Sequence, residues 1–289
     1  MILIDLNQVL LAGLMVQIAG QKNVKLEEDL IRHIALNILR GHVKQFRAEY
    51  GEVVLCCDNR KYWRKDFFPF YKAHRKKARE KSPLDWNMIF NILGTLKEDL
   101  KQYFPYKVID VEGAEADDII GTLVPEKIRD GDILILSSDG DFLQLQQWSD
   151  YLKCGNKVKQ YNPTQKKYVV SKNPLADLKE KIITGDAGDG IPNILSPGDT
   201  FVRGVRQKVL TEGRMNNFLT KEYADYEDEN ARIGYARNQT LIDLRLIPGD
   251  IKESIITTYN NTKPAPKMKL MNYFMEKKLK NLMEVIEDF

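Results

Sequence analysis

The stretch Leu134-Ile135-Leu136-Ser137-Ser138-Asp139-Gly140-Asp141-Phe142 is an apolar run that ends at two aspartates separated by one glycine. So short a run of leucine and isoleucine favours a buried β-strand. The glycine gives the backbone enough freedom for both carboxylates to turn towards one point beyond the strand end. A single Asp-Gly-Asp is also common in ordinary turns, so this stretch indicates a functional site only if the pattern recurs.

The pattern does recur, because four short apolar runs lead to a carboxylate. Residues 2–4 precede Asp5, residues 53–57 precede Asp58, residues 108–111 lie just before Glu115, and residues 134–136 lead to Asp139. Such runs, alternating with helical segments, predict an α/β fold with a mostly parallel sheet and helices on both faces. Ligands of these sheets bind outside the carboxyl ends of the strands, so we expect the four acids to converge there.

Composition limits the class of protein. The chain has 289 residues, which fits one sheet domain with a smaller helical partner. With a hydrophobic content of 43% and a mean hydropathy of −0.41, it contains no apolar run near the roughly 20 residues that span a bilayer. No secretory leader is visible, which predicts a cytoplasmic protein. The three cysteines lack zinc-site spacing and are expected to stay reduced.

The segment 60–81, RKYWRKDFFPFYKAHRKKAREK, is strongly basic. It holds ten Lys or Arg against two acids, a local charge of +8, so the remainder of the chain is near −5. Its cations alternate with aromatic residues. Basic groups hold phosphates and aromatic faces stack on bases, so the segment predicts contact with single-stranded nucleic acid. The alternative is a solvated helix face, but such a face usually mixes both signs of charge.

Helices and a hairpin are predicted between these motifs. Residues 27–50 form a crossover helix that ends at Gly51, and a second helix begins at residues 84–86 and stops before Pro105. Residues 157–161 and 167–170 flank a turn and predict a hairpin at one edge of the sheet.

Two further acidic stretches complete the candidate site. Glu115, Asp117 and Asp118 begin a short helix, where acids commonly serve as caps or dipole partners. Three acids in four positions after a buried strand exceed what capping needs. The loop Gly185-Asp186-Ala187-Gly188-Asp189-Gly190-Ile191-Pro192 adds two more acids, although such a loop is usually only a turn.

Taken in order, these motifs resemble the structure-specific 5′ nuclease, or flap endonuclease, family over residues 1 to about 200. They are LIDLNQ at Asp5, CCDNR at Asp58, the acids of residues 115–118, SSDGDF at 137–142 and the Gly-Asp loop at 185–192. The segment YWRKDFFPFYKAHRKKARE, SSDGDF and the terminal EDF most resemble the branch of T-even-type bacteriophage ribonucleases H. The resemblance implies a PIN-like (resolvase-like) nuclease domain over residues 1–182, with a helical arch at about 60–82. A smaller helical domain with a helix-hairpin-helix-like region would occupy residues 183–289.

The resemblance also implies a role for individual residues. The first Mg²⁺ would be held or oriented by Asp5, Asp58, Glu115, Asp117 and Asp139, with Asp118 in support. The second ion would be served by Asp141, Asp186 and Asp189, partly through water. The scissile phosphate would be contacted by Lys72 and Arg75, with Arg64 and Tyr71 nearby. Backbone contacts with nucleic acid are expected from Lys65, Lys76, Lys77, Arg79, Arg203, Arg206 and Lys208.

Physical chemistry independently favours bound cations at this site. Eight or nine carboxylates in one pocket cannot all ionise unaided, because like charges raise each other's pKa. An Asp-rich site without histidine suits Mg²⁺, or Mn²⁺ as a substitute, better than zinc. Two such ions can generate a hydroxide nucleophile and stabilise the departing 3′ oxygen of a phosphodiester, with no covalent enzyme intermediate.

The sequence departs from the family after the Gly-Asp loop. Residues 195–203, LSPGDTFVR, replace the usual glycine-rich hairpin, which puts duplex binding and a K⁺ site in this region in doubt. At the C-terminus, Met271, Met275, Leu279, Leu282, Ile286 and Phe289 are spaced as one amphipathic helix. We expect that helix to pack on the chain's own helical domain. A contact with a single-stranded-DNA-binding protein, as the resemblance implies, is the alternative.

The sequence therefore predicts a Mg²⁺-dependent 5′ to 3′ nuclease, acting as a monomer in the cytoplasm of a bacterial host if it is phage-encoded. Its expected substrates are DNA and RNA–DNA hybrids with 5′ ends, flaps or forks, and its expected task is the removal of RNA primers and adjacent DNA from lagging-strand fragments. One alternative is a PIN-type endoribonuclease acting on free RNA. Another is a catalytically idle DNA-binding scaffold, which would be expected to lack one of the main acids.

Overall fold

A single six-stranded sheet forms the centre of the molecule. The computed structural model describes residues 1–18 and 27–289, and the strand order is β3-β2-β1-β4-β5-β6. The strands are β1 (Ile2–Asp5), β2 (Val53–Cys56), β3 (Lys107–Ile109), β4 (Ile133–Leu136), β5 (Val158–Asn162) and β6 (Lys167–Val169). All neighbours pair in parallel except β5 and β6, which form the predicted edge hairpin.

Helices cover both faces of this sheet, as predicted. Successive side chains of a strand point to opposite faces, so Ile2 and Ile4 of β1 join one core cluster and Leu3 joins another. The first face is covered by α1 (Leu6–Ile18), α2 (Glu28–Tyr50), α5 (Trp86–Tyr103), α13 (Lys267–Glu276) and α14 (Lys280–Met283). The second is covered by α6 (Ala116–Lys127) and α12 (Gly249–Asn261), with the 3₁₀ segments η2 (Gly140–Gln147) and η4 (Leu244–Leu246).

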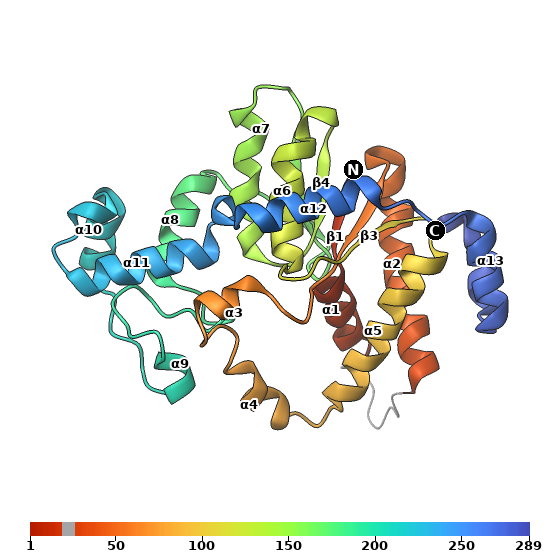
Figure 1. Cartoon of the computed structure of the whole chain (residues 1–289), viewed down its shortest axis with the longest axis horizontal. Coiled ribbons are helices and arrows are strands. Elements are labelled where there is room, and N and C mark those ends of the chain that lie inside the picture. The colour runs from red at the N-terminus through yellow and green to blue at the C-terminus, as the bar shows by residue number, and fades with distance from the viewer. Residues whose placement is uncertain (19–26) are drawn as a thin grey trace.

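Two regions lie outside these layers. The basic segment contains α3 (Trp63–Phe67) and α4 (Arg75–Glu80) and extends below the carboxyl ends of the strands before it joins α5 (Figure 1). We call residues 60–82 the arch segment. The other region lies at the opposite end from α13 and contains α8 (Pro174–Thr184), α9 (Thr200–Arg203), α10 (Glu212–Thr220) and α11 (Glu229–Ile242). The remaining short helices are η1 (Ile128–Asp130), α7 (Trp148–Tyr151), η3 (Tyr223–Asp225) and η5 (Ile286–Asp288).

The hydrophobic core clusters do not divide at residue 182, the predicted domain boundary. A third cluster joins Leu178 and Ile183 of α8 to Phe218 and Tyr235, so α8 belongs with the helical region. Beyond residue 243 the chain returns to the sheet, where Ile255 of α12 packs into the second cluster. The stretch from α8 to α11 therefore shares a separate core with Phe68 and Tyr71 of the arch segment, while the last 45 or so residues complete the sheet domain.

The prediction for the C-terminus was wrong in two respects. The chain forms two helices, α13 and α14, because it turns at Lys278, whose φ of 55° is incompatible with a continuous helix. This C-terminal segment packs on the sheet domain and not on the helical region, through Tyr273, Phe274 and Phe289 against Phe104. Met275, expected in the buried stripe, is 53% exposed.

One helix was missed by the sequence reading. Helix α1 begins at Leu6, directly after β1 ends at Asp5, so no turn residue separates the two elements. None of the helices in the described part of the chain is long and apolar enough to cross a membrane.

Candidate active site

The strand-end acids converge, and local hydrogen bonds fix their side chains. Asp5 ends β1 and accepts hydrogen bonds from Gln8 N at 3.3 Å and from Ser137 Oγ at 3.1 Å. Asp58 follows β2 and accepts from Ala116 N at 2.9 Å, which ties it to the start of α6. Asp139 follows β4 and accepts from Asp141 N at 2.9 Å across the glycine between them. The carboxylates are therefore held in place before any ligand binds.

The electrostatics of this group show that its charges repel one another. Burial, together with the carboxylates of Asp58 and Asp139, raises the pKa of Asp5 to about 8. Burial also raises the pKa of Asp117, where Lys72 opposes the shift and Asp139 adds to it. The pKa of Asp139 is raised mainly by burial, against the opposing charge of Lys181. A protein that keeps such acids close together without neutralising them has a site that favours a cation.

Arg64 and Asp118 lie beneath the pocket. The Arg64 guanidinium forms ion pairs with Glu115 at 3.2 Å and with Asp118 at 2.8 Å, and it donates to the Leu241 carbonyl at 2.9 Å. Asp118 also accepts from Glu115 N at 2.9 Å, which is the capping role considered for it. Arg64 is only 2% exposed, so it is out of reach of a phosphate in this structure and instead orients Glu115.

The second group of acids is Asp141, Asp186 and Asp189, and here the chain supplies cations. Lys181 Nζ lies between Asp141 Oδ1 and Asp186 Oδ2, 2.9 Å from the latter. Although burial opposes the shift, Lys181 lowers the pKa of Asp186. Sequence reading missed Lys181. Its position five residues before Asp186, on a helix that leads into the acidic loop, was the available signal.

The Gly-Asp loop has a backbone that requires glycine. Gly185 has a φ of 74°, and a Cβ there would lie 2.4 Å from the Ile191 carbonyl oxygen. This close approach belongs to a two-residue pairing in which Asp186 N donates to Ile191 O and Ile191 N donates back. The loop is thus closed on itself, and it projects Asp186 and Asp189 towards the strand ends.

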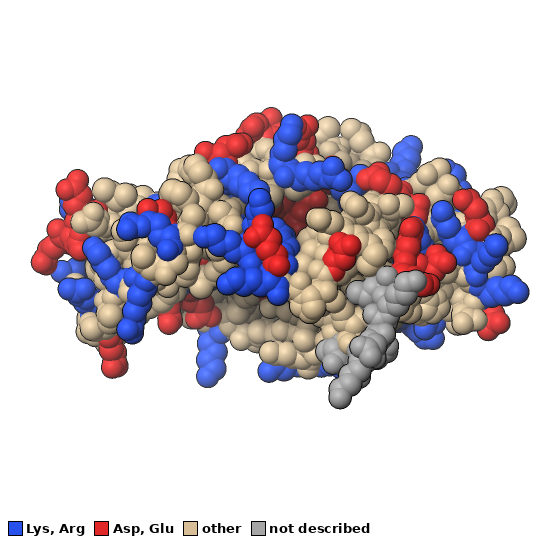
Figure 2. All heavy atoms as spheres, turned by 90° about the horizontal axis from the view of Figure 1, so that it is seen from below, with Lys and Arg blue, Asp and Glu red and all other residues tan. Residues whose placement is uncertain are grey.

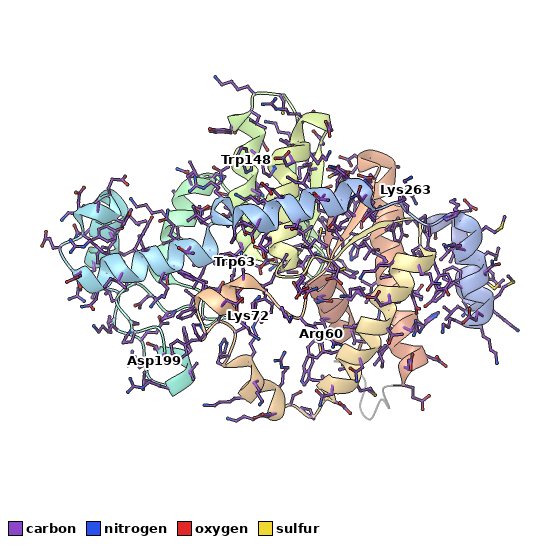
Figure 3. The ribbon with its side chains drawn as sticks, in the orientation of Figure 1. Arg60, Trp63, Lys72, Trp148, Asp199 and Lys263 are labelled. Atoms are coloured by element: carbon purple, nitrogen blue, oxygen red, sulfur yellow. The ribbon has the colours of Figure 1, made fainter. Side chains whose placement is uncertain are left out.

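The base of the arch segment is attached to this loop. Lys72 N donates to the Asp189 carbonyl at 2.7 Å, and its Nζ donates to Glu115 Oε1 at 2.7 Å. Tyr71 Oη donates to Asp189 Oδ2 at 2.7 Å, and Arg75 Nη2 to Asp189 Oδ1 at 2.5 Å. Burial would lower the pKa of Lys72, but Asp189 and Glu115 raise it above its usual value, so the amine stays charged. In Figure 3, Lys72 and Trp63 lie below the sheet on the arch segment.

The remaining candidate cations lie on the surface. Lys65, Lys76, Lys77 and Arg79 are exposed on the arch segment, and Arg203, Arg206 and Lys208 are exposed at and after α9. Lys77 Nζ donates to the Val202 carbonyl at 3.3 Å, so the two basic stretches meet. Seen from the side of α4, Lys and Arg gather around a hollow in which acidic side chains are visible (Figure 2).

The donor set fits hard divalent cations. Carboxylate oxygens are the ligands that Mg²⁺ and Mn²⁺ prefer, and they outnumber every other donor at the strand ends. Among residues 1–18 and 27–289, however, no three His, Cys, Asp or Glu side chains lie so that they could hold a metal ion together as they stand. Several carboxylates instead bind Lys72, Arg75 or Lys181.

Comparisons with known proteins agree with this geometry. Residues 17–173 match the family model of the 5′-3′ exonuclease N-terminal resolvase-like domain, and residues 173–289 match that of the T4 RNase H C-terminal domain. The ribonuclease H of Enterobacteria phage T4 is 36% identical over 99% of this chain and 95% of its own length. A flap endonuclease Xni from Shewanella sp. (strain MR-4) is 30% identical over 64% of this chain and 70% of its own.

Solved structures share the fold. A T5 5′-exonuclease with bound zinc has a TM-score of 0.61 and 15% sequence identity, over 91% of this chain and 98% of its own. A T5 flap endonuclease in complex with DNA and metal ions has a TM-score of 0.56 and 15% identity, over 90% of this chain and 99% of its own.

Proposed function

Because this chain belongs to the 5′-3′ exonuclease family and is therefore a phosphodiester-hydrolysing nuclease, we propose that it uses Mg²⁺ to remove RNA primers and short 5′ flaps from lagging-strand fragments. The observation that carries the proposal is the convergence of strand-end and loop carboxylates beside a cationic arch segment. Clustered carboxylates favour divalent cations, and the neighbouring Lys and Arg side chains favour a phosphate.

The residues divide between two ions. Asp5, Asp58, Asp117 and Asp139 would hold the first ion, with Glu115 oriented by Arg64. Asp141, Asp186 and Asp189 would serve the second. When bound, such ions activate water for attack on the phosphodiester and stabilise the oxygen that departs. Mn²⁺ is the expected substitute for Mg²⁺, and one T5 neighbour is described with zinc.

The cations of the chain act on the substrate. Lys72 and Arg75 stand at the pocket on the arch segment, where each is held by an acid of the site. Moving from these acids to a phosphate would place their charge where negative charge develops during cleavage. The exposed cations of α4 and α9 would instead hold the nucleic-acid backbone, a role that depends on salt concentration.

We also propose single-stranded-DNA-binding protein as a partner of the C-terminal region. In this structure the apolar residues that α13 offers to a partner are few, namely Met268 at 77% and Met275 at 53% exposure. Replacing both with Asp should leave basal cleavage unchanged and abolish stimulation by that partner. Unchanged stimulation would remove α13 from the proposal.

A panel of three substrates tests the proposed function. A 5′-labelled flap, a nicked RNA–DNA hybrid and free RNA are each incubated with and without Mg²⁺. We expect cleavage of the flap and of the hybrid, only with the ion. Preferential cleavage of free RNA would favour an endoribonuclease, and binding without cleavage of any substrate would favour a scaffold.

A further inference from the structure

The two groups of acids differ in how their charge is balanced. Within the described residues, Asp5, Asp58, Asp117 and Asp139 form no ion pair with a Lys or Arg side chain. Each is held by uncharged donors or faces another acid. In the described part of the chain, these four carboxylates of the first ion's site thus have no Lys or Arg partner that would have to leave before a divalent cation binds.

The second group is already neutralised by the chain. Asp141 and Asp186 share Lys181, and Asp189 binds Arg75 and Tyr71. Lys181 Nζ therefore occupies the space between two of the carboxylates that would hold a second ion. A cation can enter only if this ammonium leaves, because two positive charges cannot share the same pair of oxygens at that range.

Lys181 is able to leave. Its side chain is 26% exposed and comes from the last turn of α8, whereas the Arg64 side chain is 3% exposed in a closed network. A lysine has a flexible stem and a compact charge, so it can exchange one anionic partner for another without a change in the backbone. A phosphate that enters the pocket offers such a partner to both Lys181 and Arg75.

We propose that Lys181 is a built-in counter-ion that keeps the second divalent ion out until nucleic acid binds. In the free protein the ammonium bridges Asp141 and Asp186. A backbone phosphate of the substrate draws Lys181 and Arg75 away, and the freed carboxylates then take the second ion. The first ion binds without substrate and the second binds after it. This inference rests on the proposed metal-dependent function.

Counting Mn²⁺ ions bound to the full chain, by calorimetry and by electron paramagnetic resonance, tests the order. Without nucleic acid, the wild type should bind one Mn²⁺ tightly. Lys181→Met should bind two, with the affinity for the second raised about tenfold or more, as expected for removal of a unit charge at contact distance. Adding a short 5′-phosphorylated DNA oligonucleotide should bring the wild type to two ions and leave the variant at two.

Lys179→Met is the matched control. Lys179 lies on the same helix, but its Nζ donates to the Lys221 carbonyl at 2.8 Å, away from the acids. It should bind Mn²⁺ as the wild type does. Lys181→Gln, which keeps hydrogen-bonding capacity without the charge, serves if the Met variant melts at a lower temperature than the wild type.

The possible results distinguish a failure of the Lys181 inference from a failure of the proposed metal-dependent function. A wild type that binds two ions equally well without DNA, or a Lys181 variant whose second ion is no tighter than the control's, overturns the inference. A wild type that binds no Mn²⁺ with or without the oligonucleotide overturns the proposed function itself.

Discussion

At the scale of single residues, the site is built from charges that oppose folding. Asp5 is buried next to other carboxylates and has a pKa near 8, so it takes up a proton when the chain folds at neutral pH without a metal. Burial likewise raises the pKa values of Asp117, Asp139 and Glu115. The fold tolerates this repulsion because neutral donors such as Ser137 and the backbone of residues 8 and 116 hold the acids in position.

Replacing Asp139 with Asn keeps the shape of the side chain and removes one charge. Cleavage should fall by more than about a hundredfold, since even partners that only orient metal ligands contribute 10–100-fold. Binding of a 5′ flap should persist or strengthen, because repulsion of the phosphates decreases. Single-turnover rates and equilibrium binding measure the two effects, and turnover near the wild-type rate would exclude Asp139 as a ligand.

The stability of the metal-free protein should fall as pH rises. A carboxyl whose pKa is raised in the folded state binds more protons folded than unfolded, so the free energy of unfolding decreases between about pH 4 and pH 8. One such group contributes a slope of about 1.4 kcal/mol per pH unit. Urea unfolding in EDTA should show this slope, and Asp5→Asn should reduce it. A flat profile, or one that rises with pH, contradicts the raised pKa.

Arg64 should matter for stability more than for contact with substrate. Arg64→Met leaves Asp118 buried without a cation and Glu115 paired with Lys72 alone, which should cost about 3–5 kcal/mol in the free energy of unfolding. Urea unfolding of Arg64→Met against Arg64→Lys measures this. A loss below 1 kcal/mol, together with a large loss of flap cleavage, would return Arg64 to the catalytic role first expected for it.

At the scale of elements, the arch segment is attached to the Gly-Asp loop at its base, whereas along α4 its cations are exposed and Lys77 contacts Val202. Lys72, Tyr71 and Arg75 all bind Asp189, while Lys76 and Arg79 project from the surface. His74 packs next to Gly190, where an added Cβ would lie 2.8 Å from its Nδ1. We therefore expect the base of the arch segment to act on the active site. The exposed surface of α4 is expected to contact the nucleic-acid backbone.

Paired substitutions should separate these two parts. Lys72→Ala with Arg75→Ala should slow the chemical step by at least about a hundredfold, more than they weaken binding, because their charge is needed as the phosphate reacts. Lys76→Ala with Lys77→Ala should weaken binding and reduce its dependence on salt. Single-turnover rates and salt titrations of both pairs distinguish them, and equal behaviour would refute the division.

Elements differ in how well the sequence predicts them. The strands and their terminal acids were predictable, because a buried parallel strand is a continuous apolar run and its ligand edge is fixed by topology. Helix α1 was not, since no turn separates Leu6 from Asp5. The ion pairs of Lys181 and the burial of Arg64 depend on contacts between residues far apart in the sequence, and no local sequence pattern predicts such contacts. The break at Lys278 was hidden because the apolar spacing continues across it.

At the scale of the whole molecule, the C-terminus returns to the sheet domain. Arg47 Nη1 donates to the Phe289 carbonyl at 2.7 Å, and Arg40 pairs with Asp288 at 2.8 Å. The ring of Phe289 is fully buried against Phe104 and Phe274. The end of the chain thus completes the core on which the active site stands.

Truncation at this end should therefore unfold the protein. Deleting residues 267–289 exposes much of the first core cluster, so we expect loss of soluble protein. Phe289→Ala is the milder version and should cost about 3–5 kcal/mol in the free energy of unfolding. Met268→Ala, at an exposed position of the same segment, should stay within about 0.5 kcal/mol of the wild type. A truncated protein that melts like the wild type would show that this packing is dispensable.

The central claim is that acids from separate strand ends form one metal site. A crystal structure of the full chain soaked in Mn²⁺, with anomalous diffraction measured at the manganese edge, tests it most directly. The account predicts an anomalous peak within coordination distance of Asp5, Asp117 and Asp139. A peak elsewhere, or none at Mn²⁺ concentrations that support cleavage, would contradict it.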